Sequence, residues 1–393
     1  MNFNYYLPVN LIFGRGKAEL IGTEAAKYGK KALIVTGHSS TKKSGLLDRA
    51  VKLLADAGLE SAIYDKVSQN PLTTTAIEGA DFAKSEGCDV VIALGGGSIM
   101  DCAKAIAFIV KNDGDINDYI FNRKHSDEAL PLILVPTTCG TGSEGNGFAV
   151  LTNPDTGDKK SLRCPAIVGK ASIIDSELME TMPKSILASV GFDALCHCME
   201  AYTSKIGQPI TDMLAHEGMA LIGEHLVKVY KGEGTADDWD AITWASTIGG
   251  MVINTAGVTL AHGMEHPASG LKNIVHGRGL AALTPIITEM SVGGAPEKFA
   301  EISRCLGGTD EKDCAERINT LLSQIDLKIT LGEQGIKEED VDWMVDNFFK
   351  VSIGNYNNHP VTFTREQIKE IYLKALSVSY THLRAHETDQ YLV

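Results

Sequence analysis

The segment GFDALCHCME, residues 191–200, places a carboxylate and an imidazole among apolar neighbours. Asp193 and His197 are four residues apart, so on a helix they share one face, with Cβ atoms roughly 5–6 Å apart. One interpretation is an aspartate at a helix N-terminus together with a hydrogen-bonded core histidine. The other is half of a metal site. The segment alone leaves both open.

Further histidines follow in AHGMEHPASG and NIVHGRG, where His262 and His266 are again four apart and His276 comes next. Each one alone is more often a hydrogen-bonded polar residue than a ligand. As a set, Asp193, His197, His262 and His276 offer one carboxylate and three imidazoles, which suit a divalent transition metal. Three other histidines lack comparable partners and are expected to be structural: His125, His216 and His225.

Two glycine-rich segments, GGGSIMD and PTTCGTGSEGNG, each follow a short apolar run. A glycine turn that opens a helix presents backbone N–H groups and the positive end of the helix dipole, which suit a phosphate. Met100 occupies the third glycine position of the usual dinucleotide fingerprint, so the first segment alone is equally consistent with a tight structural turn. Two such loops on neighbouring parallel strands would face one crevice, and together they favour a bound nucleotide.

The elements that must position these residues change character along the chain. KALIVT (31–36), DVVIAL (89–94) and PLILVP (131–136) predict buried parallel strands, and residues 43–58 and 73–87 are apolar at helical intervals. This alternation predicts a doubly wound α/β domain over residues 1–183. Segments such as 186–204 and 210–230 are helical in period, so we expect an all-helical domain over residues 184–378.

Composition excludes several classes of protein. The 393 residues are 44% hydrophobic and 22% charged, as in ordinary globular proteins of about two domains. The formal charge of −14 provides no basic surface for nucleic acid or an anionic membrane. No stretch approaches the roughly 18 apolar residues of a membrane span, and the start lacks the features of a secretory signal. With eight scattered cysteines, we expect reduced thiols in a cytoplasmic protein.

Taken together, GGGSIMD, PTTCGTGSE, GFDALCH and the AHGMEHPASG…VHGRG pair resemble the signature segments of the iron-containing alcohol dehydrogenase family, group III. The resemblance runs from about residue 5 to residue 377. It implies a fold like that of dehydroquinate synthase, with the active site between a dinucleotide-binding domain and a helical domain. It also implies that Asp193, His197, His262 and His276 bind Fe(II) or Zn(II), and that His266, beside the metal, is the candidate catalytic proton relay.

The same resemblance implies a cofactor-binding surface made of both glycine-rich loops, the loop after KALIVT and a few single positions. Its residues are Gly37, Ser40, Lys43, Asn70, Gly95, Gly96, Gly97, Ser98, Asp101, Thr137, Thr138, Thr141, Ser143, Asn146 and Lys160. The chain carries Gly145-Asn146 where many family members have Val-Thr, and in this it resembles the NADPH-dependent butanol dehydrogenase-like branch.

The loop GHSSTKKSG, residues 37–45, bears on the choice between NAD and NADP. In dinucleotide folds a carboxylate after the second strand commonly binds the ribose 2′-hydroxyl and repels a 2′-phosphate. Gly37 stands where NAD-linked relatives tend to carry Asp, and no acidic residue appears before Asp48. Because Ser40 and Lys43 offer a donor and a cation, we expect NADP to be preferred; the alternative is a solvated loop with surface lysines.

The expected function is a metal-dependent alcohol dehydrogenase or aldehyde reductase that transfers a hydride between NAD(P)(H) and a small alcohol or aldehyde. One alternative is a polyol (glycerol-type) dehydrogenase or a lyase of the dehydroquinate synthase type, and the fourth protein ligand argues against it. The other is an inactive metal-binding relative, and the two intact glycine-rich loops argue against that. The family also implies a homodimer or larger homo-oligomer without nucleic acid or membrane partners.

The C-terminal segment SYTHLRAHETDQYLV, residues 379–393, neither continues the preceding helical period nor resembles the family's ending. We expect it to be a non-native or disordered tail. Its His382 and His386 imitate the spacing of a metal-binding pair, and we expect no metal there.

Overall fold

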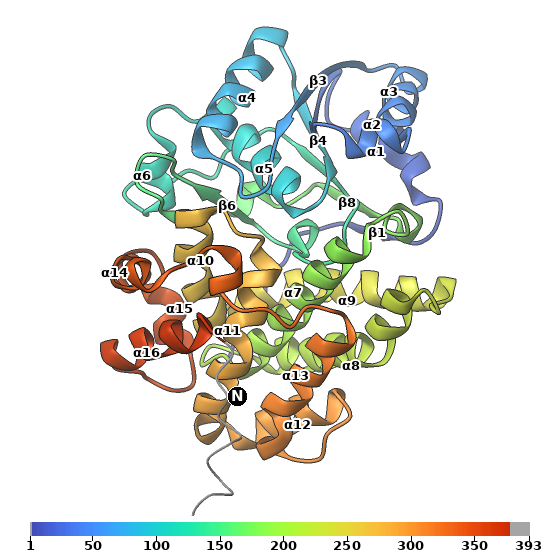
Figure 1. The fold of residues 1–393 in the computed structure, drawn as a ribbon. Helices are drawn as coiled ribbons and strands as arrows, with labels where there is room; N and C mark the ends of the chain where they lie inside the picture. Colours follow the sequence, from blue (N-terminus) through green and yellow to red (C-terminus); the bar gives the residue numbers. More distant parts are fainter. Residues whose placement is uncertain (1, 378–393) are drawn as a thin grey trace, which may run out of the picture.

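The computed structural model describes residues 2–377, and the expectation for residues 379–393 lies outside this range. Figure 1 shows a sheet flanked by helices, formed by the first part of the chain, above a layer of helices formed by the second part. The predicted fold class, a parallel α/β domain followed by a helical domain, is confirmed.

The first part is built on a six-stranded sheet with the order β1-β8-β5-β4-β2-β3, in which every neighbouring pair is parallel. The three predicted runs form its centre as β2 (Lys31–Gly37), β4 (Val90–Gly95) and β5 (Leu132–Pro136). The remaining strands are short or partly exposed and were not predicted: β1 (Leu11–Phe13), β3 (Glu60–Val67), β8 (Ala171–Ile174) and the antiparallel hairpin of β6 (Phe148–Thr152) and β7 (Lys159–Arg163).

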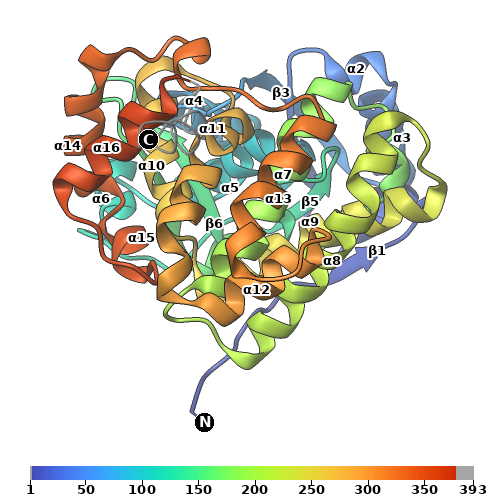
Figure 2. The ribbon, with the colours of Figure 1, turned by 60° about the horizontal axis from the view of Figure 1, so that its bottom comes forward.

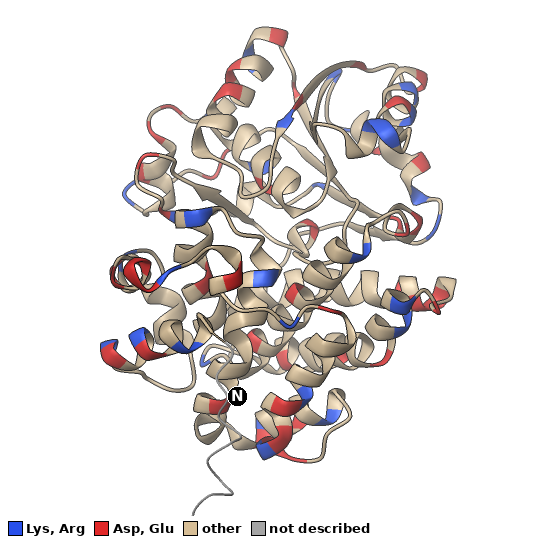
Figure 3. Cartoon of the chain, viewed as in Figure 1, with Lys and Arg blue, Asp and Glu red and all other residues tan. Residues whose placement is uncertain are grey.

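Helices cover both faces of the sheet, which explains why its central strands are apolar without interruption. On β2, Leu33 and Val35 enter the core beneath α4 (Thr73–Glu86) and α5 (Gly97–Lys111), while Ala32 and Ile34 enter the core beneath α1 (Ile21–Ala25) and α3 (Leu46–Asp56). Two short helices complete this part: α2 (Ser40–Lys43) and α6 (Ile116–Ile120). Figure 3 shows the charged residues mainly on the outer helices and loops.

The second part is helical, and no strand follows Ile174 as far as residue 377. The two predicted segments lie in α7 and α8, which pack against each other and on α9. In Figure 2, α14 and α16 lie beside α10 at one side of this layer. The helices are α7 (Lys184–Thr203), α8 (Pro209–Lys231), α9 (Ala236–Ala256), α10 (Leu260–Lys272), α11 (His276–Ser291), α12 (Pro296–Cys305), α13 (Cys314–Gln324), α14 (Val341–Val351), α15 (Ile353–Asn358) and α16 (Arg365–Ala375).

The second glycine-rich loop touches the helical domain directly, through a pair of glycines. Gly142 has a φ of 56°, and a Cβ placed on Gly250 of α9 would lie 1.8 Å from the Gly142 carbonyl oxygen. Larger residues at these positions would push the loop away from α9. None of the helices in residues 2–377 is both long and apolar enough to cross a bilayer.

Candidate active site

Three imidazoles converge on one carboxylate oxygen, and the four side chains come from three helices. Asp193 Oδ1 lies 3.3 Å from His262 Nε2, 3.6 Å from His276 Nε2 and 3.7 Å from His197 Nε2. Asp193 and His197 occupy successive turns of α7, while His262 lies in the first turn of α10 and His276 is the first residue of α11. The structure therefore brings together all four predicted ligands.

The spacing of these atoms fits a metal ion. Ligand bonds of about 2.0–2.2 Å in a tetrahedral site put neighbouring donor atoms about 3.3–3.6 Å apart, close to the distances around Asp193 Oδ1. Ligand atoms of Asp193, His262 and His276 all lie within 4.8 Å of one another, and the ring of His197 stacks on His262 with centroids 4.5 Å apart. One carboxylate and three imidazoles are a suitable donor set for Fe(II) or Zn(II).

The other ring nitrogen of each histidine is held by a hydrogen bond, which fixes the ring orientation. His262 Nδ1 donates to Glu200 Oε1 at 2.6 Å, and His276 Nδ1 donates to Glu265. His197 Nδ1 faces the carbonyl of Gly140, in the second glycine-rich loop, at 3.4 Å. Each Nε2 is thereby directed toward Asp193.

The electrostatic environment also suits a cation. Burial lowers the pKa of His262, but the carboxylates of Glu200 and Asp193 outweigh burial and raise this pKa to about 10. Burial raises the pKa of Asp193, but the surrounding histidines overcome this and hold it well below its usual range. A concentration of negative charge around imidazole nitrogens favours a bound positive charge, whether a proton or a metal ion.

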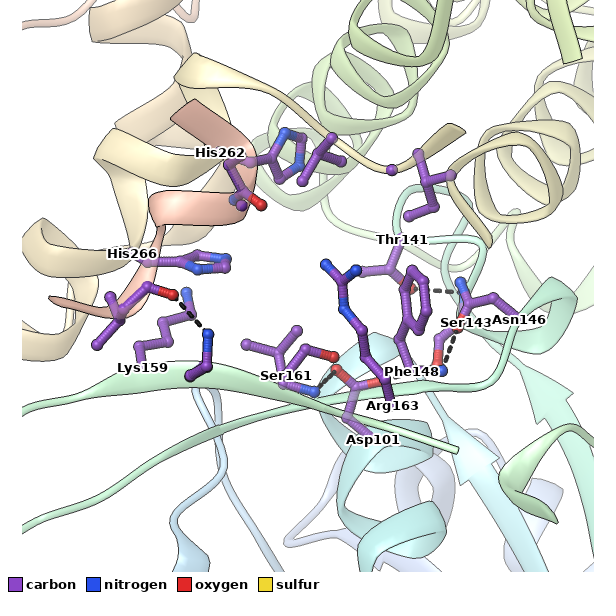
Figure 4. Close-up of a pocket in the computed structure, with 18 of the residues that line it drawn as sticks. Asp101, Thr141, Ser143, Asn146, Phe148, Lys159, Ser161, Arg163, His262 and His266 are labelled. Carbon is purple, nitrogen blue, oxygen red and sulfur yellow. Dashed lines mark hydrogen bonds between the residues drawn. The ribbon is translucent and has the colours of Figure 1, made fainter. Parts of the chain in front are cut away.

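The four candidate metal ligands form one wall of a cavity of about 500 Å³ between the two domains. Across the cavity lie the N-terminus of α5 and the second glycine-rich loop (Figure 4). Of the predicted cofactor residues, those that line the cavity are Asn70, Gly97, Ser98, Asp101, Thr141, Ser143, Asn146 and Lys160. Four others, Gly95, Gly96, Thr137 and Thr138, belong to the same loops but are not among its lining residues.

The two glycine-rich loops pack tightly against each other, as their position on neighbouring strands predicts. Gly95 pairs with Pro136 in the parallel register of β4 and β5. A Cβ on Gly97 would lie 2.2 Å from the Thr141 side chain, so the absence of a side chain allows this contact. Their shared crevice is an appropriate place for the phosphates of a dinucleotide.

Beneath this crevice, the buried ammonium of Lys104 joins two residues of the second loop to the first residue of β6. Its Nζ donates to the carbonyls of Ser143, Asn146 and Phe148 at 2.6, 2.9 and 2.8 Å, and to the Asn146 side-chain oxygen at 3.1 Å. Burial lowers the pKa of Lys104 to about 8. Asn146 is only 2% exposed, so its side chain mainly holds the loop and offers little surface to a ligand.

Lys159 and Lys160 differ in their surroundings. The Nζ of Lys159 donates to Asn70 at 2.9 Å and to Glu265 at 3.3 Å, next to the ligand set. Lys160, the residue predicted from the sequence, donates to the carbonyl of Val351 at 2.7 Å. The structure thus adds Lys159 as the lysine that connects Asn70 to the ligand set.

His266 lies one helical turn beyond His262, and its ring centroid is 6.0 Å from that of His276. It lines the cavity, in the position expected of a residue beside the metal (Figure 4). Burial, with the nearby Lys159 ammonium, lowers the pKa of His266, so the imidazole is neutral at pH 7.

The residues predicted to select NADP lie apart from this cavity, at the carboxyl end of β2. Gly37 ends β2, while Ser40 and Lys43 belong to α2. The neighbouring strand β3 supplies Asp65, which forms an ion pair with Lys42. This carboxylate was not predicted from the sequence because it approaches the loop from another strand.

Three other residues of the site were not predicted: Glu200, Glu265 and Lys159. Glu200 lies one turn after His197 and Glu265 directly precedes His266, so helical spacing places both near the ligands. No sequence signal assigns each carboxylate to its imidazole, because the partners come from different helices.

Comparisons with known proteins match nearly the whole chain. Residues 8–176 match the family described as iron-containing alcohol dehydrogenase, and residues 187–376 match the C-terminal part of the Fe-containing alcohol dehydrogenase family. The NAD-dependent methanol dehydrogenase of Bacillus methanolicus is 32% identical over 382 residues, which are 95% of this chain and 100% of that protein. The NADPH-dependent butanol dehydrogenase of Clostridium saccharobutylicum is 30% identical over 380 residues, with coverage of 94% and 96%.

Among solved structures, an archaeal halo-thermophilic alcohol dehydrogenase from a Red Sea brine pool resembles this chain with a TM-score of 0.91. The sequence identity is 34%, and the match covers 96% of this chain and 99% of that one.

Proposed function

The chain belongs to the iron-containing alcohol dehydrogenase family, and from this membership we propose how its residues oxidise alcohols and reduce aldehydes with NAD(P). The observation that carries the proposal is the convergence of three imidazole Nε2 atoms on Asp193 Oδ1, at the wall of a cavity shared with the glycine-rich loops. The four-residue ligand set and the two loops favour this reaction over the lyase and inactive alternatives.

We assign the roles as follows. Asp193, His197, His262 and His276 hold the metal, while Glu200 and Glu265 orient two of the imidazoles. When bound, the metal polarises the substrate oxygen and the nicotinamide exchanges the hydride. Gly97 and Ser98, at the start of α5, bind the cofactor phosphates through backbone N–H groups. His266, neutral and beside the ligand set, relays the proton of the hydroxyl group.

The experiment is replacement of His262 with alanine. We expect the variant to lose metal and turnover and to keep its fold, because the ligand is removed from a site held by three other side chains. Metal content by elemental analysis, aldehyde reduction and circular dichroism measure these three properties. His216→Ala is the matched control, because His216 is an exposed histidine of α8. Full metal content and normal turnover in His262→Ala would refute the assignment.

We propose further that NADPH is preferred over NADH. Gly37 brings no carboxylate to the end of β2, and Lys43 has no acidic partner among residues 2–377, whereas Lys42 is neutralised in part by Asp65. A charge-assisted hydrogen bond to the 2′-phosphate contributes roughly 1.5–3 kcal/mol, or about a tenfold to hundredfold preference. Relatives of both kinds exist, since the matched methanol dehydrogenase is NAD-dependent and the butanol dehydrogenase is NADPH-dependent.

The test compares kcat/KM for NADPH and NADH with one aldehyde, in the wild type and in Gly37→Asp. A Cβ at Gly37 would meet its nearest neighbours at 3.5 Å, an ordinary contact, so the variant should fold. We expect Gly37→Asp to erase or reverse the preference, and Gly293→Asp, where a Cβ has no neighbour within 4 Å, to leave it unchanged. Equal values, or an NADH advantage, in the wild type would contradict the proposal.

Three broader expectations also remain proposals. We place the domain boundary between residues 183 and 184, where α7 begins. The expected cytoplasmic location rests on the scattered spacing of the eight cysteines. A homodimer or larger homo-oligomer is expected from the family, and light scattering of the full chain measures it.

A further inference from the structure

Arg163, the last residue of β7, lines the active-site cavity with its guanidinium directed into it (Figure 4). The guanidinium stacks on Phe148, with 4.6 Å between its carbon and the ring centroid. Within residues 2–377 no carboxylate lies within ion-pair distance of Arg163 and no acceptor receives a hydrogen bond from it. The Arg163 side chain is exposed to solvent inside the cavity, and although partial burial lowers its pKa, an arginine remains charged at neutral pH.

The other charges of this wall do not neutralise Arg163. Lys160 also lines the cavity, and burial followed by repulsion from Arg163 lowers its pKa. Asp158, a carboxylate directly before β7, accepts hydrogen bonds from Lys350 at 2.6 Å and from Asn347 at 2.7 Å. The wall therefore presents two cations whose charge the described protein leaves uncompensated.

Asp101 is the remaining carboxylate on this side of the cavity, and its oxygens are also occupied. Oδ1 accepts from the Ser143 hydroxyl at 2.7 Å, and Oδ2 accepts from the Val150 backbone N–H at 3.0 Å. The nearby Lys104 adds a compensating positive charge. Asp101 therefore binds Ser143 and Val150 and does not pair with Arg163. The N–H donors of the Arg163 guanidinium are available to a bound molecule.

The position of Arg163 relative to the candidate metal-binding residues indicates which molecule its guanidinium binds. Lys159 and Arg163 are four residues apart on β7, roughly 13 Å along the strand, and Lys159 touches Glu265 beside the metal ligands. Both side chains reach into the same cavity (Figure 4). An aldehyde with its carbonyl at the candidate metal ligands would share this cavity with the Arg163 guanidinium.

We propose that Arg163, assisted by Lys160, binds an anionic group at the far end of the substrate, so that the preferred aldehydes are short ω-anionic ones carrying a carboxylate, sulfonate or phosphonate. This inference deepens the proposed function and rests on it, because it assumes that the carbonyl lies at the metal ligands. Guanidinium binds such groups through two parallel hydrogen bonds, and its stacking on Phe148 fixes its plane.

The test compares two substrates of the metal-loaded enzyme, 4-oxobutanoate and its methyl ester, which differ in charge and by one methyl group. The measured quantity is the ratio of their kcat/KM values. We expect a ratio above one in the wild type and a loss of about tenfold to a hundredfold in Arg163→Met, with partial recovery in Arg163→Lys. Arg365→Met is the matched control, because Arg365 also stacks on a phenylalanine, Phe349, but pairs with Asp346 outside the cavity.

A second measurement does not depend on turnover. Calorimetric titration of the same enzymes with succinate should show binding at least tenfold weaker in Arg163→Met than in the wild type and in Arg365→Met. If Arg163 instead binds a cofactor phosphate, Arg163→Met raises KM for the nicotinamide cofactor equally with both aldehydes and leaves the substrate ratio unchanged. That result, or unchanged succinate binding, overturns the inference. If no aldehyde is reduced, the proposed function fails, and the succinate titration still decides the role of Arg163.

Discussion

Replacing Glu200 with glutamine should weaken metal binding without removing a ligand. Glu200 is 6% exposed, and its two oxygens have separate tasks. Oε1 accepts from His262 Nδ1 at 2.6 Å, while Oε2 accepts from the backbone N–H of Thr259 at 2.6 Å and from its hydroxyl at 3.2 Å. Glutamine has the same shape but only one accepting oxygen and no charge.

The size of the effect follows from these contacts. In either orientation the amide directs its NH₂ group toward a donor, so the hydrogen bond to His262 or the one to Thr259 is lost. The neutral partner also makes the His262 ring a weaker base and hence a weaker ligand. Loss of such an outer partner typically lowers metal affinity 10–100-fold, about 1.4–2.7 kcal/mol.

The assay is competition between the enzyme and a chelator of known affinity for Zn(II) or Fe(II). We expect the metal Kd of Glu200→Gln to rise 10–100-fold, with kcat/KM largely recovered at saturating metal. Glu301→Gln, an exposed carboxylate of α12 that pairs with Arg304, should leave Kd unchanged. A Kd within twofold of the wild type, in a folded variant, would show that Glu200 serves packing and does not tune the ligand.

Three further predictions concern stability. Lys104→Met leaves the carbonyls of Ser143, Asn146 and Phe148 without their buried donor. It should lower the free energy of unfolding, measured in urea, by about 3–5 kcal/mol. A decrease below about 1 kcal/mol would contradict this role. The folded-state pKa of Lys104, about 8, lies below its usual 10.5. The unfolded chain therefore binds the extra proton between these values, and the wild type should gain stability relative to Lys104→Met as pH rises from 8 to 10.5. Burial lowers the pKa of His359 from 6.5 to about 4, so the free energy of unfolding should fall by up to about 3 kcal/mol as pH drops from 6.5 to 4. In His359→Gln this part of the loss should disappear. The same loss of stability in the variant as in the wild type would contradict the prediction. Removal of the metal by chelation should lower Tm, and Fe(II) or Zn(II) should restore it. At a metal concentration of 100 Kd, the expected stabilisation is about 2.7 kcal/mol. A Tm that does not depend on metal would argue against a metal site formed by the folded state.

The fold could be predicted where a local pattern is sufficient. β2, β4 and β5 are buried on both faces, so each is a continuous apolar run that can be recognised alone. β3 alternates between buried and exposed positions and β1 has only three residues, so neither stands out from its surroundings. The sheet order is a property of the packing of helices on both faces, and no local pattern encodes it.

By itself, the sequence determined the candidate metal ligands and the candidate phosphate-binding loops, because their chemistry depends on residue type and short spacing. Asp193 and His197 share a helix face at an interval of four, and glycines after a strand leave backbone N–H groups open. The tertiary structure decided everything that depends on which elements meet. Glu200 faces His262 across two helices, and Asp65 reaches Lys42 from the neighbouring strand. Among residues 2–377, Arg163 has no carboxylate partner because the folding of β7 places it in the cavity, while Asp158, on the same hairpin, pairs with Lys350.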